Sequence, residues 1–152
     1  MICWKTSLKP FHKMNKWVQN VVSKWKTEGV KINNGTSLGD IEALESVLDF
    51  KFPDDFKDFY LAIDGFKDLD WQEHMFYFWP LEKIIEEFNE SLDKNFIGFC
   101  DFLLASHYIG FKKNQTGIFK MYSISDRAED NSIAQTFEEV VGMINSRSDL
   151  IY

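Results

Sequence analysis

The sequence predicts a single α+β domain, and three observations carry this prediction. The chain has 152 residues, which is the length of one ordinary domain. Its 45% hydrophobic and 27% charged residues form a composition that folds rather than stays disordered. Apolar residues recur with helical spacing in the first half, whereas runs rich in Ile, Phe and Tyr follow in the second half. Strands clustered in this way favour an α+β arrangement over repeated βαβ units.

Three helices are expected in the first half of the chain. The first covers about residues 11–28, where apolar side chains recur every three or four positions and Gly29 suits the end of a helix. The second starts after Ser37, whose side chain can cap the first turn, and it breaks before the next proline. The third covers about residues 54–63 and stops at Gly65.

The second half begins with a polar, acidic loop over residues 66–74. A short aromatic strand is expected over 75–79, and Pro80 opens the helix that follows. Three further strands are expected, over residues 96–104, 108–111 and 118–122. The turn at 114–117 between the last two predicts an antiparallel hairpin. Thr136 begins the final helix with a capping-box pattern.

Charge is distributed unevenly along the chain. The net charge is −7, from 17 Lys and Arg against 24 Asp and Glu. Residues 1–36 carry seven Lys and one acid, a balance of +6, whereas residues 40–93 carry sixteen acids and four Lys, a balance of −12. An acidic chain is a poor general nucleic-acid binder, because phosphate contacts need concentrated positive charge. The acidic middle segment instead favours basic partners.

One candidate binding surface lies in this acidic segment. We call it the acidic belt, and it consists of Asp64, Phe66, Asp68, Asp70, Trp71 and Glu73. Carboxylates around an exposed aromatic side chain are typical of a hot spot that binds a basic protein surface. The alternative is a solvated loop without a binding role, in which the Trp71 side chain is buried in the core. The sequence leaves both interpretations open.

The lysines of the first helix also admit two interpretations. They could bind anionic lipid or RNA. However, they are spread around the polar face of a helix whose other face is bulky. A solvated face that pairs with the acidic belt of the same chain is therefore favoured. No nucleic-acid partner and no membrane partner is expected.

No metal site and no cofactor is predicted. The three histidines, His12, His74 and His107, are far apart in the sequence and match no zinc motif. The acidic belt lacks the spacing and the glycine of an EF-hand loop. Residues 35–40 contain glycines without the Lys-Ser/Thr of a phosphate-binding loop.

No catalytic residue is assigned. Cys100, Asp101, Ser106 and His107 are close in sequence, so a Cys-His or Ser-His pair can be drawn. The glycine pattern of a nucleophile elbow is absent, and a core cysteine beside a turn between strands is the simpler interpretation. Asp101 interrupts an apolar strand face. It either presents a carboxylate to a partner or marks a bulge, a strand end or a satisfied polar contact, and we favour the second interpretation.

The compartment is expected to be the cytoplasm. The beginning of the sequence lacks the apolar stretch of a secretory signal. The most apolar local run, over residues 75–81, is far shorter than a membrane span. Two cysteines are too few for a disulfide scaffold, so reduced thiols are expected.

The middle of the chain resembles a known family. The residues that carry the resemblance are Ile41-Glu42-Ala43-Leu44-Glu45, then Phe52-Pro53-Asp54-Asp55-Phe56-Lys57-Asp58-Phe59-Tyr60, then Ile63-Asp64-Gly65-Phe66. They are similar to the SUKH superfamily, the Smi/Knr-type family of yeast cell-wall regulators and bacterial immunity proteins. The later strands and the final helix fit the same pattern. Asp64-Gly65 stands where the family has Asn-Gly, and Phe52 stands where it has a leucine.

The resemblance implies a central, mostly antiparallel sheet flanked by helices over residues 11–147. Residues 1–10 would then be an N-terminal extension and residues 148–152 a C-terminal tail. The resemblance implies no catalysis. It implies a protein-binding module, an immunity protein that binds and neutralises a cognate bacterial toxin, often a nuclease. A regulatory interaction scaffold without a toxin is the alternative.

Overall fold

The fold is seen in a computed structural model that describes residues 14–123, 125 and 127–152. The expected extension over 1–10 and the first residues of the expected first helix lie outside the described residues. The helices are α2 (Lys16–Thr27), α3 (Leu38–Leu48), α4 (Asp54–Ala62), α5 (Leu81–Glu90), α6 (Phe137–Ser146) and the 3₁₀ helix η1 (Asp149–Ile151). The strands are β1 (Ile32–Asn34), β2 (Ile63–Phe66), β3 (Phe76–Phe78), β4 (Phe96–Phe102), β5 (His107–Lys112) and β6 (Gln115–Tyr122).

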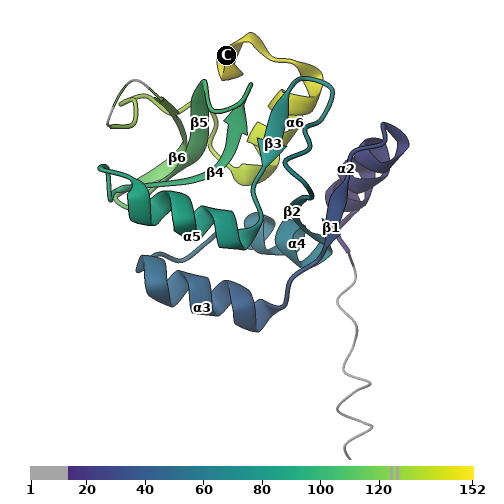
Figure 1. Cartoon of the computed structure of the whole chain (residues 1–152), viewed down its shortest axis with the longest axis horizontal. Coiled ribbons are helices and arrows are strands. Elements are labelled where there is room, and N and C mark those ends of the chain that lie inside the picture. Colours follow the sequence, from purple (N-terminus) through teal and green to yellow (C-terminus); the bar gives the residue numbers. More distant parts are fainter. Residues whose placement is uncertain (1–13, 124, 126) are drawn as a thin grey trace, which may run out of the picture.

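The strands form two antiparallel sheets. One has four strands in the order β3-β4-β5-β6, and the other pairs β1 with β2. Figure 1 shows α3 and α5 side by side, with α5 below β4 and with α6 on the other side of the larger sheet. The expected α+β domain with an antiparallel sheet flanked by helices is therefore confirmed. The β5–β6 hairpin is confirmed as well, since Lys112 pairs with Gln115 across its turn.

The helix starts follow the capping residues expected from the sequence. The Ser37 hydroxyl accepts a hydrogen bond from the Asp40 amide at 3.1 Å, and the Thr136 hydroxyl accepts one from the Glu139 amide at 3.1 Å. Each side chain satisfies an amide that has no partner within the helix. In α6 the Glu139 carboxylate also accepts from the Gln135 amide, at 3.0 Å.

The end of α4 differs from the expectation. The helix stops at Ala62, and Ile63 begins β2, which pairs with β1. Gly65 does not end a helix but lies within this strand with φ of +63°. A Cβ at Gly65 would lie 2.4 Å from the backbone carbonyl carbon of Trp79, so only glycine allows the two segments to approach so closely. The pairing of β1 with β2 thus ends the helix earlier than its local apolar pattern predicted.

The C-terminal residues pack against the larger sheet. Ile151 is fully buried, and the Tyr152 ring lies 5.1 Å from the Phe102 ring and 5.8 Å from the Phe76 ring. The Lys120 ammonium, in β6, donates a hydrogen bond to the Tyr152 carbonyl at 2.6 Å. The residues predicted as a C-terminal tail thus make packing and hydrogen-bond contacts with the sheet.

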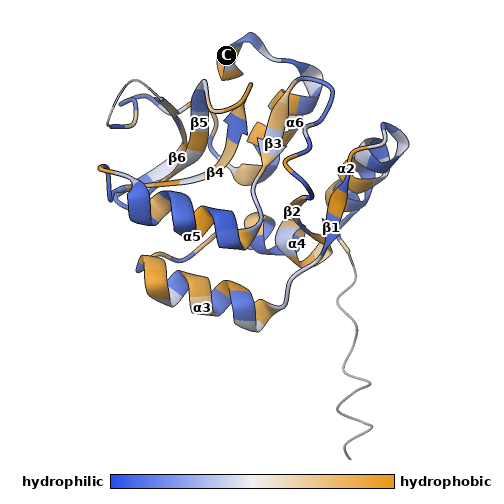
Figure 2. Cartoon of the chain, in the orientation of Figure 1, coloured by the Kyte–Doolittle hydropathy of each residue, from blue (hydrophilic) through white to orange (hydrophobic). Residues whose placement is uncertain are grey.

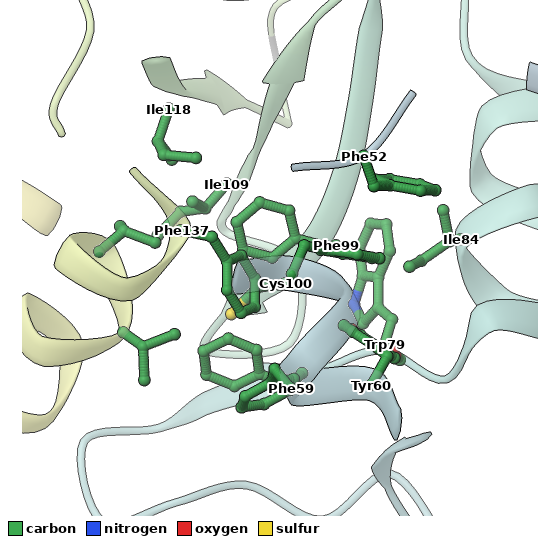
Figure 3. Packing of buried hydrophobic residues seen from close by; sticks show 14 of the residues in the cluster. Phe52, Phe59, Tyr60, Trp79, Ile84, Phe99, Cys100, Ile109, Ile118 and Phe137 are labelled. Atoms are coloured by element: carbon green, nitrogen blue, oxygen red, sulfur yellow. The ribbon is translucent and has the colours of Figure 1, made fainter. Parts of the chain in front are cut away.

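The core is built largely from aromatic side chains. Figure 3 shows Phe59, Phe99 and Phe137 gathered near Cys100, and these three rings come from α4, β4 and α6. Figure 2 shows hydrophobic and hydrophilic residues mixed along α3 and α5. The buried residues of α4 and α6 are apolar or aromatic. Phe137 is the most connected ring in the core. Its ring packs against those of Trp17, Phe56, Phe59, Tyr60, Phe78, Phe99 and Phe111.

A buried carboxylate holds the segment between α3 and α4. Glu45 is buried, and its Oε2 accepts a hydrogen bond from the Phe52 amide at 2.7 Å. The Lys57 ammonium lies 3.4 Å from the same oxygen. A buried acid is tolerated only with such partners. The contact fixes the extended approach to Pro53, where the sequence predicted a break.

Candidate functional site

The acidic belt is built on the loop that joins β2 to β3. Asp68, Leu69 and Met75 have positive φ values of 58°, 59° and 68°, a conformation that non-glycine residues rarely adopt. Left-handed backbone costs roughly 1–2 kcal/mol per residue, and it clusters at functional sites. This loop is therefore held in shape by contacts that outweigh its strain.

Gln72 supplies several of those contacts. Its side chain is buried, and its Oε1 accepts hydrogen bonds from the His74 amide at 2.7 Å and from the Phe76 amide at 3.1 Å. The backbone amide of Gln72 donates to the Phe76 carbonyl at 3.0 Å. At the start of the loop, the Lys67 amide donates to the Lys31 carbonyl at 2.8 Å. The loop is a fixed surface feature.

Two members of the acidic belt do not lie on its surface. Phe66 is fully buried, with its ring 4.9 Å from the Trp25 ring, so the expectation that it is an exposed aromatic anchor is wrong. It is the last residue of β2, and the loop begins after it. Asp64 is half-buried, and its Oδ1 accepts a hydrogen bond from the Leu81 amide at 2.8 Å, at the start of α5. Burial raises the pKa of Asp64.

Two further carboxylates are paired within the chain. The Lys24 ammonium, in α2, lies 3.0 Å from Glu73 Oε1, and the Lys31 amide donates to Asp70 Oδ2 at 2.8 Å. Hydrogen bonds to Glu28 and Glu73 raise the pKa of Lys24, and the bond from Lys24 lowers the pKa of Glu73. The interpretation that the basic helix pairs with the acidic belt is therefore confirmed for Lys24.

Trp71 is neither buried nor fully exposed. Its side chain is 38% exposed, and it lines a hollow of about 320 Å³ together with Glu28, Gly29 and Met75. Leu69 and Met75 beside it are 69% and 43% exposed. The sequence interpretation missed these last two residues. The sequence did contain an indication of their exposure, because Leu69 and Met75 are large apolar residues inside an otherwise polar segment.

The turn between β4 and β5 adds a second apolar element. Leu103, Leu104 and Ala105 are consecutive residues with φ of 47°, 55° and 70°. The Asp101 carboxylate accepts from the Ala105 amide at 3.1 Å and stabilises this turn. Leu104 is 80% exposed. The expected strand over 96–104 thus ends two residues early, at Phe102.

The turn and the loop lie side by side. The Leu103 amide donates a hydrogen bond to the Met75 carbonyl at 2.9 Å. The backbone of the turn therefore lies against that of the loop at Met75, and both segments carry exposed apolar side chains. We call this surface the rim, and it consists of Asp68, Leu69, Asp70, Trp71, Glu73, Met75, Leu103 and Leu104.

Asp101 has its polar contacts inside the chain. It is buried, and its Oδ2 accepts a hydrogen bond from Trp79 Nε1 at 2.7 Å, in addition to the bond from the turn. Burial raises the pKa of Asp101. The favoured interpretation, a carboxylate satisfied by local polar contacts, is confirmed.

Cys100 and His107 lack the arrangement of an activated pair. Cys100 lies opposite Ile109 in the sheet, whereas His107 lies opposite Phe102. Burial raises the pKa of the Cys100 thiol, which disfavours the reactive thiolate. Burial lowers the pKa of His107 to about 4, and its Nε2 has no hydrogen-bond partner among the described residues.

Within residues 14–123, 125 and 127–152, no group of three or more His, Cys, Asp or Glu side chains comes together to hold a metal ion. Among the helices of that same part, none is long and apolar enough to cross a membrane.

The fold and the rim together define a class of protein. This is a mixed α+β domain that presents fixed, strained loops with exposed apolar side chains beside carboxylates, an arrangement suited to binding another protein. A model of the SMI1 / KNR4 family (SUKH-1) matches residues 35–142, and the chain belongs to this family. The resemblance stated from the sequence is thereby confirmed. No curated protein matches the chain.

Proposed function

We propose that this chain is a cytoplasmic, non-catalytic immunity protein that binds and neutralises a cognate toxin through the rim. Membership of the SUKH family supports this function, because the family includes toxin immunity proteins. The observation that carries the proposal is the rim itself. Its exposed apolar side chains include Leu69 and Trp71, which are sequence neighbours of Asp68 and Asp70, and Leu104 on the adjoining turn.

The chemistry of the rim indicates the partner. An aromatic and aliphatic centre with charged residues around it is the arrangement of an interface hot spot. The carboxylates favour a basic partner surface, and nuclease toxins are usually basic because they bind phosphates. The fixed backbone of the two strained segments reduces the entropy lost on binding. Asp64 and Phe66 do not meet the partner in this proposal, because Phe66 is buried against Trp25 and the Asp64 carboxylate accepts a hydrogen bond from the first amide of α5.

Co-expression with the product of a neighbouring gene tests this function. If the neighbour encodes the toxin, the chain restores growth of cells that express it, and the two proteins purify together. The wild-type chain and a Leu104→Ser variant are compared, with Val47→Ser on α3 as the control, because Val47 is also exposed but lies outside the rim. We expect Leu104→Ser to lose protection and Val47→Ser to keep it.

The alternative function makes a different prediction for the same experiment. A regulatory scaffold without a toxin partner would leave growth unaffected by every neighbouring product. Failure of the chain to bind or protect against any neighbour would overturn the immunity proposal. Equal protection by Leu104→Ser and by the wild type would support the immunity function. It would also show that the toxin does not bind through the rim.

A further inference from the structure

The hollow beside Trp71 lies where the end of α2 meets the loop between β2 and β3. Its volume is about 320 Å³, at the lower end of the range of ligand-binding pockets. Its walls come from residues 28–30 on one side and from residues 70–73 and 75 on the other. Trp71 and Met75 are 38% and 43% exposed, and the Glu73 side chain is 46% exposed. The lining is therefore open to a partner, and it continues the surface of the rim.

The lining carries an excess of negative charge. Its charged members among the described residues are Glu28, Asp70 and Glu73, all carboxylates. The Lys24 ammonium contacts Glu28 and lies 3.0 Å from Glu73, so one cation serves two of them. The third carboxylate, that of Asp70, has a neutral partner, the backbone amide of Lys31 at 2.8 Å. Negative charge thus remains uncompensated at the hollow.

Each of the three carboxylates also keeps one oxygen for a further donor. Contacts within the chain use Glu28 Oε2, Glu73 Oε1 and Asp70 Oδ2. His74 shares Glu73 Oε1, with its Nε2 at 3.2 Å. The second oxygen of each carboxylate has no hydrogen-bond or ion-pair partner within the part of the chain that the structure describes. The end of α2 adds the negative partial charge of a helix C-terminus.

An arginine side chain matches this lining better than a lysine does. Its guanidinium is planar, so it can stack on an exposed ring while its edge donates to carboxylates. A lysine ammonium is a point charge that cannot do both in this way. The methylene groups of an arginine can also cover apolar surface such as that of Met75. The hollow offers an open ring, an apolar wall and unused carboxylate oxygens together.

We propose that this hollow is the anchor pocket of the rim and receives one arginine side chain of the basic partner. The guanidinium stacks on the exposed ring of Trp71 and donates to the unused oxygens of Asp70 and Glu73. Its methylene groups lie against Met75. The inference deepens the proposed function and rests on it for the nature of the partner, but the binding of arginine is measured without any toxin.

A peptide titration followed by NMR tests the proposal. The probe is acetyl-Gly-Arg-Gly-amide at low salt, and the matched control has citrulline in place of arginine, which keeps the shape but removes the charge. The indole N–H signal of Trp71 reports the hollow, and that of the buried Trp79 serves as the reference. We expect the arginine peptide to shift the Trp71 signal with saturation, the citrulline peptide to shift it much less, and the Trp79 signal to stay in place.

Variants of the lining locate the bound peptide. Removing one charge, in Asp70→Asn or Glu73→Gln, should weaken binding by up to about fivefold, which is the range of a single exposed ion pair. Asp68→Asn is the matched control, because Asp68 is exposed on the same loop but does not line the hollow. Lys24→Met should act in the opposite direction. It removes the cation that competes for Glu73, so binding should tighten by up to about fivefold.

Several outcomes would overturn the proposal. The Trp71 signal might not move, or the citrulline peptide might shift it as far as the arginine peptide does. Asp68→Asn might weaken binding as much as Asp70→Asn, or Lys24→Met might leave binding unchanged; either result would place the arginine elsewhere. Each failure would leave protection by the wild-type chain unaffected, whereas failure of the co-expression experiment would leave peptide binding unaffected. The two proposals therefore fail separately.

Discussion

Phe137→Ala is expected to lower the free energy of unfolding by about 3–5 kcal/mol. The side chain is fully buried, and its ring is surrounded by rings from α2, α4, β3, β4 and β5. Removing it deletes apolar contacts on every side and leaves a cavity that the rigid aromatic neighbours cannot fill. Urea denaturation, monitored by the far-UV circular dichroism signal, measures the loss.

The control for this prediction is a truncation on the surface. Val47→Ala removes two methyl groups from a side chain that is 63% exposed. It should change the free energy of unfolding by no more than about 0.5 kcal/mol. If Phe137→Ala cost as little as Val47→Ala, the ring would not lie at the centre of the core.

The second large effect is a loss of stability as the pH falls from 7 to 5. Burial lowers the pKa of His107 to about 4 in the folded protein, with the nearby Lys120 charge acting in the same direction, while a backbone hydrogen bond to Ile151 opposes the shift. The unfolded chain has the ordinary value of about 6.5. Between about pH 6.5 and pH 4, His107 is protonated in the unfolded state but stays neutral in the folded state. The stability present above pH 6.5 is therefore lost progressively down to about pH 4.

The size of this effect follows from the pKa difference. The slope is at most about 1.4 kcal/mol per pH unit, so the loss from His107 between pH 7 and pH 5 is up to about 2 kcal/mol. Burial raises the pKa values of Asp64 and Asp101, and these carboxyls act with the opposite sign at lower pH. The range from 7 to 5 is thus the informative one.

A substitution that cannot titrate isolates the contribution of His107. His107→Phe places an apolar ring among the rings of Phe76, Phe102 and Tyr122. Urea denaturation at pH 7 and at pH 5 is compared for both proteins. We expect the difference between the two pH values to shrink clearly in the variant. An equal pH dependence in both proteins would show that His107 is not buried in its neutral form.

Local patterns in the sequence predicted much of the fold. Ser37 and Thr136 cap the helices that they were expected to cap, because a helix start depends on residues within one turn. The β1–β2 pair was not predicted. Ile32-Asn33-Asn34 is too short and too polar to read as a strand, and its partner is about thirty residues away. Such pairing depends on tertiary contacts that no local pattern reveals.

The candidate site was predicted only in part. Residues 67–74 were predicted correctly as a loop, but Asp64 and Phe66 lie in β2. The burial of Phe66 depends on its contact with Trp25, which lies on a helix far away in sequence. Leu103 and Leu104 looked like the continuation of an apolar strand. The turn that exposes them is imposed by the Asp101 carboxylate and by the hydrogen bond to Met75. Neither contact can be inferred from the two leucines themselves.

The central claim is that the rim receives a basic partner, and the association rate with the toxin tests it most directly. Asp68 is an exposed carboxylate of the rim, and Asp68→Lys reverses its charge; Glu42→Lys makes the same change on α3. At low salt we expect Asp68→Lys to slow association about threefold or more, and the difference to vanish at high salt, where exposed charges are screened. Glu42→Lys should have a much smaller effect. An unchanged rate for Asp68→Lys, or equal slowing by both variants, would contradict the claim.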